Sequence, residues 1–293
     1  MDEAEWLAER FEQHRPRLQA VAYRMLGSPA EAEDAVQDAW LRLNKSKADQ
    51  IDNLGGWLTT VVARECLHML RARRHRREDS FAAHLPDPVI TPDGDLDPEQ
   101  EALLADSVGL ALLVVLDSLT PAERLAFVLH DMFELPFDEI APMVGRTSTA
   151  ARQLASRARR RVSGAEIPTP DPGLARQREV VDAFFAAARA GDFDALVQIL
   201  APDVVARVHA GAGQHATLIR GVQAVAKLAH SPRGAELHRV LVNGTPGAVI
   251  TMNGRPFSVL AFTVVDGKIV QIDGIRDRDR VRRIAAAVLL GAR

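Results

Sequence analysis

The stretch FDEIAPMVGRTSTAARQLASRARRRV, residues 137–162, decides how the middle of this 293-residue chain folds. Its first part places apolar residues on one face of a short helix. These residues are Phe137, Ile140, Ala141 and Val144. Gly145-Arg146-Thr147 then makes a tight turn, and Thr147 or Ser148 can cap a second helix that ends near Val162. Helix, glycine turn and helix form the helix-turn-helix arrangement, whose second helix can lie in the major groove of DNA.

The second helix has two different sides. An inward, apolar side is predicted to consist of Ala151, Leu154, Ala158 and Val162. The outward side consists of Thr149, Arg152, Gln153, Ser156 and Arg160, with Arg157 alongside. Arginine and glutamine near the start of such a helix can reach base edges, and arginines further along can meet phosphates. No acidic residue lies between Ser148 and Arg161, which favours a DNA-binding face over an ordinary solvated basic helix.

The helical block that contains this motif is predicted to span residues 99–164. One of its helices starts after Leu119, where Thr120 caps, Pro121 occupies the first turn and Glu123 closes a capping box. A stretch rich in proline, aspartate and glycine precedes the block, and we interpret residues 80–98 as an extended linker.

An earlier block, from about residue 6 to residue 77, is almost continuous amphipathic helix. Ser28, Pro29 and Glu31 predict the start of one helix. Its buried stripe is Ala32, Ala35, Val36, Ala39, Trp40 and Leu43. A different face carries Asp34, Gln37, Asp38 and Leu41. This face is either a solvated acidic surface or a docking surface for a partner, since an apolar residue stands among the acids.

The next helix, about residues 54–77, also has two sides. Its predicted buried side is Leu58, Val62, Cys66, Met69 and Leu70. Its other side carries Trp57, Thr60, Arg64, His68 and Arg71. A polar, cationic stripe with one aromatic at its start suits a nucleic-acid backbone and a stacked base. The alternative is that Trp57 is a core residue and His68 an ordinary surface histidine.

Composition and charge limit the function classes. Net charge is only −3, but arginines cluster within residues 71–77 and 152–161, which suggests two local contacts with phosphate. Cys66 is the single cysteine, so a disulfide framework and a cysteine zinc site are excluded. We expect no metal and no cofactor. No apolar run is long enough to span a membrane, and the acidic N-terminus does not resemble a signal peptide, which predicts a cytoplasmic protein.

The last part of the chain, residues 174–293, has an α+β pattern. Residues 176–200 are predicted to be helical with a break at Gly191-Asp192. Strands are predicted at 204–209, 237–242, 248–252, 257–265 and 268–272. Hairpin-type turns separate them at Asn243-Gly244, Asn253-Gly254 and Asp266-Gly267. The predicted fold is therefore two all-α domains followed by an α+β domain.

Taken together, the helical segments resemble the extracytoplasmic-function (ECF) RNA polymerase sigma factors over roughly residues 6–163. Residues 32–43 are similar to region 2.2 of that family, which implies that Asp34, Gln37, Asp38 and Leu41 dock on the clamp helices of core RNA polymerase. Residues 56–77 resemble regions 2.3 and 2.4, which implies contacts of the Trp57 stripe with the −10 element. Residues 135–162 resemble region 4.2, which implies that the outward side of the last helix reads the −35 element.

The sequence of the linker at residues 84–91 and the added tail resemble one subgroup of this family. In that subgroup a C-terminal SnoaL-like cone, related to nuclear transport factor 2, regulates the sigma domains. The implied domains are 1–79 (sigma-2), 99–164 (sigma-4) and 174–293 (SnoaL-like), with a short linker at 165–173. Two tail segments differ from the subgroup's usual motifs, and we expect regulatory residues there: Gly211, Gly213, Arg276 and Asp277.

Other functions stay open for the tail and for the chain. Cone folds include isomerases and cyclases, and Asp203, His209, His215, His238 and Asp273 are available, yet no nucleophile–base constellation is recognisable. We predict no catalytic residue, and an unidentified small molecule in the tail stays open as a partner. The remaining alternative is a stand-alone helix-turn-helix regulator that binds DNA without polymerase and carries a ligand-sensing or catalytic cone.

Overall fold

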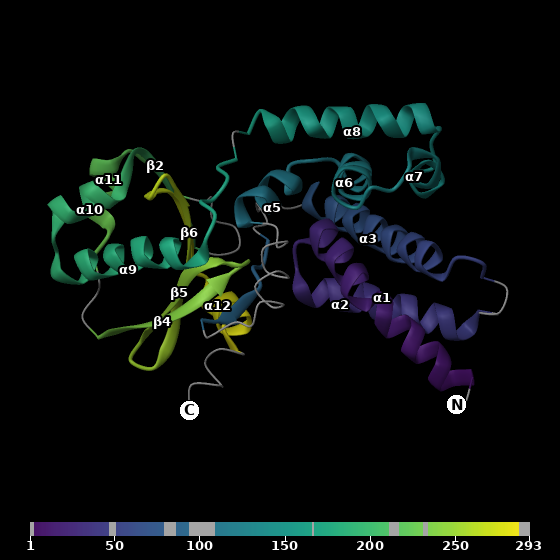
Figure 1. Cartoon of the computed structure of the whole chain (residues 1–293), viewed down its shortest axis with the longest axis horizontal. Helices are drawn as coiled ribbons and strands as arrows, with labels where there is room; N and C mark the ends of the chain where they lie inside the picture. Colours follow the sequence, from purple (N-terminus) through teal and green to yellow (C-terminus); the bar gives the residue numbers. More distant parts are fainter. Residues whose placement is uncertain are drawn as a thin grey trace. The chain divides into compact units, whose positions relative to one another are not determined.

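The structure is a computed structural model, and it describes residues 3–46, 51–78, 86–93, 109–165, 167–210, 217–230 and 234–286. The chain divides into two compact units. The first, here called the helical unit, comprises residues 1–81, 85–87 and 112–166; the second, the sheet unit, comprises 82–84, 88–111 and 167–293. Each unit is described separately below (Figure 1).

The helical unit begins with three helices, α1 (Glu3–Leu26), α2 (Pro29–Lys45) and α3 (Leu54–Glu78). The Ser28 side chain accepts a hydrogen bond from the Glu31 backbone N–H, and Pro29 is the first helical residue, so the predicted start of α2 is confirmed. Gly27 makes the turn between α1 and α2 with a φ of 69°, a left-handed conformation that favours glycine. The three helices pack on one another around fully buried residues such as Phe11, Val36 and Val62.

A second set of helices follows in the same unit: α5 (Leu110–Asp117), α6 (Pro121–Phe127), α7 (Phe137–Val144) and α8 (Ser148–Ser163). The Thr120–Glu123 capping box is present. Thr147 caps α8 by accepting from the Ala150 N–H. A π-helical turn (Val128–Met132) extends α6, which the sequence did not predict. The helix-turn-helix is thus α7, a turn with Gly145 at a φ of 67°, and α8.

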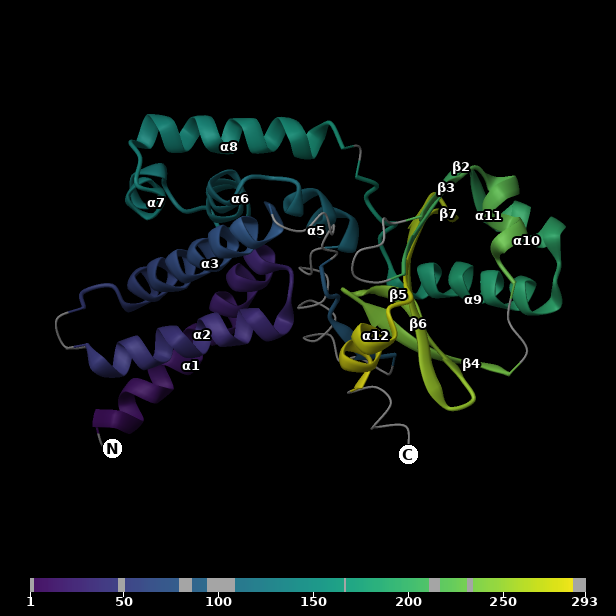
Figure 2. The ribbon, with the colours of Figure 1, turned by 180° about the vertical axis from the view of Figure 1, so that it is seen from behind.

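The two sets of helices pack against each other within the helical unit. Helices α6 and α7 both pack on α3 (Figures 1 and 2). The buried Arg124 of α6 donates from Nε to the Arg24 carbonyl of α1 at 3.0 Å. Arg17 of α1 donates from Nη2 to the Phe133 carbonyl at 3.2 Å. The predicted sigma-2 and sigma-4 segments are therefore one compact body in this structure.

The sheet unit is built on seven strands in the order β1-β4-β5-β6-β7-β2-β3. Their bounds are β1 (Ile90–Pro92), β2 (Leu200–His209), β3 (Thr217–Arg220), β4 (Ala235–Val242), β5 (Thr245–Met252), β6 (Arg255–Val265) and β7 (Lys268–Ile275). Among the strand pairs of the described residues, β2 and β7 alone run parallel. The predicted hairpin turns are confirmed, because Asn243, Asn253, Asp266 and the glycines after them all have positive φ.

Four helices complete the sheet unit: α9 (Leu174–Ala190), α10 (Phe193–Ile199), α11 (Val222–Leu228) and α12 (Arg278–Ile284). Helices α9 to α11 cover one face of the sheet and α12 packs on the other (Figure 2). Phe184 of α9 packs edge-on against Phe262 of β6, with ring centroids 5.2 Å apart. The sequence predicted α9 and α10 with the break between them, but not β3, α11 or α12.

Part of the predicted linker is an edge strand of this sheet. Strand β1 pairs antiparallel with β4, and Ile90 lies opposite Val242. Asn243 secures the start of the strand: its backbone N–H donates to the Val89 carbonyl at 2.8 Å, and its side-chain oxygen accepts from the Val89 N–H at 2.7 Å. A strand that ends in proline is suited to an edge, because proline cannot donate to a further strand.

Candidate nucleic-acid and polymerase interface

Helix α8 turns a side of small residues inward. Ala151, Ala155 and Ala158 are fully buried where α8 packs on α6 and α7. The sequence placed Leu154 and Val162 on this side as well, but both are only half-buried. The correction follows from size, since alanines permit the close approach of two helices and the larger side chains lie at the margin of the contact.

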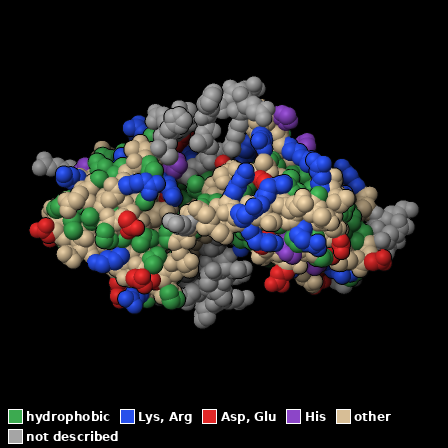
Figure 3. All heavy atoms as spheres, turned by 90° about the horizontal axis from the view of Figure 1, so that it is seen from above, with side chains coloured by type: hydrophobic (Ala, Val, Ile, Leu, Met, Phe, Trp, Pro, Cys, Tyr) green, Lys and Arg blue, Asp and Glu red, His purple; other side chains and the backbone are tan. Residues whose placement is uncertain are grey.

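Most residues of the predicted outward side of α8 are exposed. Thr149, Arg152, Gln153 and Arg160 are exposed and Ser156 is half-buried. The Arg152 guanidinium lies 5.3 Å from the centre of the Phe137 ring, which supports its side chain at the start of the helix. Lys and Arg side chains gather over this part of the molecule in the view of Figure 3. The face can therefore offer base-reading and phosphate-binding groups together.

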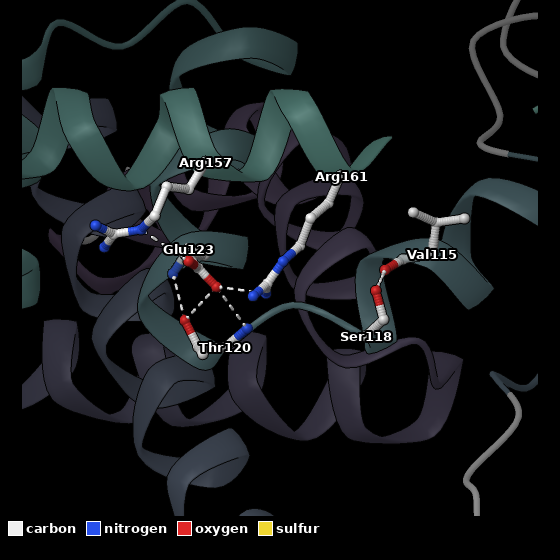
Figure 4. A network of polar contacts seen from close by, with 6 residues as sticks. All are labelled: Val115, Ser118, Thr120, Glu123, Arg157 and Arg161. Atoms are coloured by element: carbon white, nitrogen blue, oxygen red, sulfur yellow. Dashed lines mark hydrogen bonds and ion pairs between the residues drawn. The ribbon is translucent and has the colours of Figure 1, made fainter. Parts of the chain in front are cut away.

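Arg157 is held by an acid that the sequence did not connect with it. Its Nε lies 3.0 Å from Glu123 Oε1, and Arg161 Nη1 lies 3.0 Å from Glu123 Oε2 (Figure 4). The same carboxylate accepts from the Thr120 N–H at 3.1 Å and from the Thr120 hydroxyl at 2.8 Å. Glu123 thus joins the start of α6 to the last two turns of α8. On the opposite flank, Arg159 Nε lies 2.5 Å from Asp131 Oδ1.

The protonation state of Glu123 fits this arrangement. Burial alone would raise the pKa of its carboxyl, since the side chain is only 5% exposed. The hydrogen bonds from Thr120, together with Arg157 and Arg161, outweigh burial and hold the pKa below its usual value. The carboxylate is therefore ionised at neutral pH and neutralises part of the positive charge of α8.

Helix α3 presents the stripe that was predicted to contact the −10 element. Arg64, His68 and Arg71 are exposed, while Trp57 and Thr60 are half-buried. The Thr60 hydroxyl donates to the Gly56 carbonyl at 2.9 Å. The structure brings these five residues onto one side of α3, and Met69, predicted as core, is only half-buried.

Helix α2 presents the predicted docking face. Asp34, Gln37, Asp38 and Leu41 are all exposed. Leu41, the apolar residue of this face, is 52% exposed. The fully buried Ala35, Val36 and Ala39 alternate with these residues, so burial and exposure follow the helical period as predicted.

The predicted regulatory residues are placed in part. Arg276 is exposed, and its guanidinium lies 5.7 Å from the centre of the Phe257 ring. Asp277 caps α12 by accepting from the Arg280 N–H at 3.0 Å. Gly211 and Gly213 lie outside the described residues, as does His215.

Four of the five titratable groups considered for catalysis lie in the described part of the chain. Asp203 is exposed. Asp273 is buried, which raises the pKa of its carboxyl, and Gln271 Nε2 donates to it at 2.5 Å. Burial, with Arg280 and Arg207 nearby, lowers the pKa of His209 to about 4. His238 lies 3.1 Å from the Thr251 hydroxyl. Among the described residues no group of His, Cys, Asp and Glu could hold a metal ion.

The architecture defines a class: two sigma-type helical segments with a helix-turn-helix, followed by a SnoaL-like cone. Residues 10–76 match the Sigma-70 region 2 family, residues 109–162 match Sigma-70 region 4, and residues 181–272 match the SnoaL-like domain family. These matches confirm the predicted fold class and the resemblance stated above. The chain belongs to the ECF RNA polymerase sigma factors.

Individual relatives agree over most of the chain. The ECF RNA polymerase sigma factor SigJ of Mycobacterium tuberculosis is 38% identical over 290 residues, covering 92% of this chain and 91% of the relative. The probable ECF RNA polymerase sigma factor SigI of the same species is 37% identical over 266 residues, covering 88% and 89%. The crystal structure of SigJ superposes with a TM-score of 0.70 at 35% identity and covers 93% of this chain and 97% of that one. In the described part of the chain no helix has the length and apolarity that crossing a membrane requires.

Proposed function

We propose that this protein binds core RNA polymerase and directs it to promoters that its own helices select, and that its SnoaL-like domain modulates this activity. The observation that carries the proposal is helix α8. Its cationic face is exposed, its start is capped, and its back is fixed on α6 and α7 by buried alanines. A rigid helix with arginine and glutamine at its exposed start is what base reading in the major groove needs.

The other two faces complete the proposed function. The exposed Leu41 among acids on α2 suits an apolar anchor surrounded by complementary charges, and the clamp helices of polymerase are its proposed partner. The Trp57 stripe on α3 is the proposed contact with the −10 element. The proposed roles need all three faces at once, which distinguishes a sigma factor from a regulator that uses only its helix-turn-helix.

Promoter binding requires the helical unit to open. The −10 and −35 elements are separate sites on the same DNA, and the proposed function requires the sigma-2 and sigma-4 helices to contact both at once. Because α6 and α7 pack on α3, we propose that core polymerase separates the sigma-4 helices from the sigma-2 helices when it binds.

Regulation by the sheet unit is supported by the linker. The Tyr23 hydroxyl donates to the Asp87 carbonyl at 3.0 Å, and the Asp87 N–H donates to the Gly27 carbonyl at 2.7 Å, within the helical unit. A few residues later β1 is hydrogen-bonded into the sheet. A change in the sheet unit therefore acts on the chain segment that joins α3 to the sigma-4 helices. This segment is the proposed route of regulation.

Substitutions on α8 test the proposed reading of the −35 element. Arg152→Ala or Gln153→Ala should weaken the use of particular −35 bases by about 1–3 kcal/mol each. Arg160→Ala, further along the same face, should weaken binding to all sequences alike and make its salt dependence shallower. Transcription from a set of single-base promoter variants measures both effects. If Arg152→Ala and Gln153→Ala lower transcription equally from every variant, the base-reading role is wrong.

A further inference from the structure

The sheet unit contains a cavity of about 620 Å³ that the sigma function does not use. It lies between the concave face of the sheet and helices α9 and α11. Its volume is within the range of sites that hold small organic molecules in other proteins. The cavity lies entirely within the sheet unit.

Most of the cavity wall is apolar. Aromatic and branched side chains from two helices and six strands line it, including Phe185, Ile219, Ile250, Phe257 and Leu260. All five are only half-buried although they lie within a packed domain. Their exposed surface faces the cavity, and a bound apolar group would remove it from water, at roughly 25 cal/mol per Å² of apolar surface. The cavity therefore favours a ligand with an apolar body.

Two arginines and one glutamate are among the residues that line the cavity. Arg189 of α9 and Arg276, which follows β7, are exposed lining residues. Among the described residues neither guanidinium has an acidic partner; Arg276 contacts the Phe257 ring. The acid in the lining is Glu236, and it already accepts from the Thr251 hydroxyl at 3.5 Å. Two guanidinium groups beside an apolar wall suit a ligand with one anionic end.

Two of the titratable groups considered for catalysis, His209 and Asp273, do not line the cavity, whereas His230 and Glu236 do. Side chains of adjacent strand residues point to opposite faces of a sheet. Ala206, Val208 and Ile272 line the cavity, so His209 and Asp273, their neighbours along β2 and β7, point to the face on which α12 packs. The largely apolar wall with a few polar groups is typical of a cavity that binds a small molecule.

We infer that this cavity binds an amphipathic organic anion, with an apolar body against Phe185, Phe257 and Leu260 and a carboxylate or similar group at Arg276. Binding can be measured without polymerase and stands by itself. Its consequence, that such an anion alters transcription, rests on the proposed function.

Calorimetric titration of the full-length protein tests the inference, with decanoate as the anionic probe and 1-decanol and decyltrimethylammonium as probes with the same apolar chain. We expect decanoate to bind at one site, at least about tenfold tighter than either of the others, because a charge-assisted hydrogen bond is lost with the carboxylate. Equal binding of decanoate and decanol, or no binding of decanoate, would overturn the inference.

Two pairs of variants locate the site. Arg276→Gln should weaken the binding of decanoate by about tenfold and leave the binding of decanol unchanged. Arg278→Gln is its control, because Arg278 is exposed and does not line the cavity, and it should change the binding of neither probe. Ile219→Trp should fill the cavity and weaken both probes. Leu218→Trp is its control, because Leu218 is 48% exposed and does not line the cavity. Decanoate binding that survives Ile219→Trp in a protein whose melting temperature is unchanged would place the ligand elsewhere and contradict the inference.

Discussion

Replacing Glu123 by glutamine removes one negative charge and keeps the shape of the side chain. The amide oxygen can still accept from the Thr120 N–H, so the capping of α6 survives, while Arg157 and Arg161 lose their ionic partner. Glu123 is 5% exposed, but the arginines are 49% and 52% exposed, so solvent screens both pairs. At about 0.5–1 kcal/mol for each half-exposed pair, the expected loss is about 1–2 kcal/mol.

Thermal unfolding and DNA binding measure the two consequences of Glu123→Gln. For a unit of this size the loss corresponds to a melting temperature lower by roughly 2–8 °C. The released arginines should strengthen non-specific DNA binding and steepen its salt dependence, by up to about 0.9 in the logarithmic slope for each new phosphate contact. The matched control is Glu139→Gln, the same change at an exposed glutamate of α7. If both variants melt at the same temperature and show the same salt slope, Glu123 does not position α8.

Three further substitutions have defined outcomes. Leu41→Glu should weaken binding to core polymerase without changing the melting temperature, because the residue is exposed; unchanged affinity would remove α2 from the interface. Arg124→Met should weaken the packing of α6 on α1 by about 1–3 kcal/mol of free energy, since it removes the charged donor to the Arg24 carbonyl. Amide hydrogen exchange in α6 should therefore become faster, and unaltered exchange would contradict this. Burial lowers the pKa of His209 to about 4, so stability should fall as pH drops from about 6.5 to 4, a range in which only the unfolded state binds the proton. His209→Gln should reduce this pH-dependent loss of unfolding free energy by about 1 kcal/mol, as followed by the melting temperature at each pH. An unchanged pH dependence would contradict the prediction.

The local features of the fold were predictable from the sequence because their signals are local. Ser28, Thr120 and Thr147 cap the helices that their spacing predicts, and the hairpin turns adopt the expected conformation. A capping box or an Asn-Gly turn depends on residues that are neighbours along the chain. The outward sides of α2, α3 and α8 follow from the helical period for the same reason.

What the sequence did not disclose depends on residues that are distant along the chain. Strand β1 forms because it pairs with β4, where Ile90 lies opposite Val242. Its own residues, which lie among prolines and are followed by aspartate, indicate only a linker. Arg157 pairs with Glu123, which lies 34 positions earlier in the sequence, and no spacing rule predicts this pairing. The cavity likewise forms only when residues from two helices and six strands meet.

In vitro transcription with purified core RNA polymerase on a randomised promoter library tests the central claim most directly. The full chain should give transcripts from a defined set of −10 and −35 sequences, and a truncation after Gly164 should change their amount, which gives the sign of the tail's effect. Absence of transcripts from both forms, with a polymerase that another sigma factor activates, would contradict the claim. Tight footprints of the protein alone on DNA would then favour a stand-alone helix-turn-helix regulator.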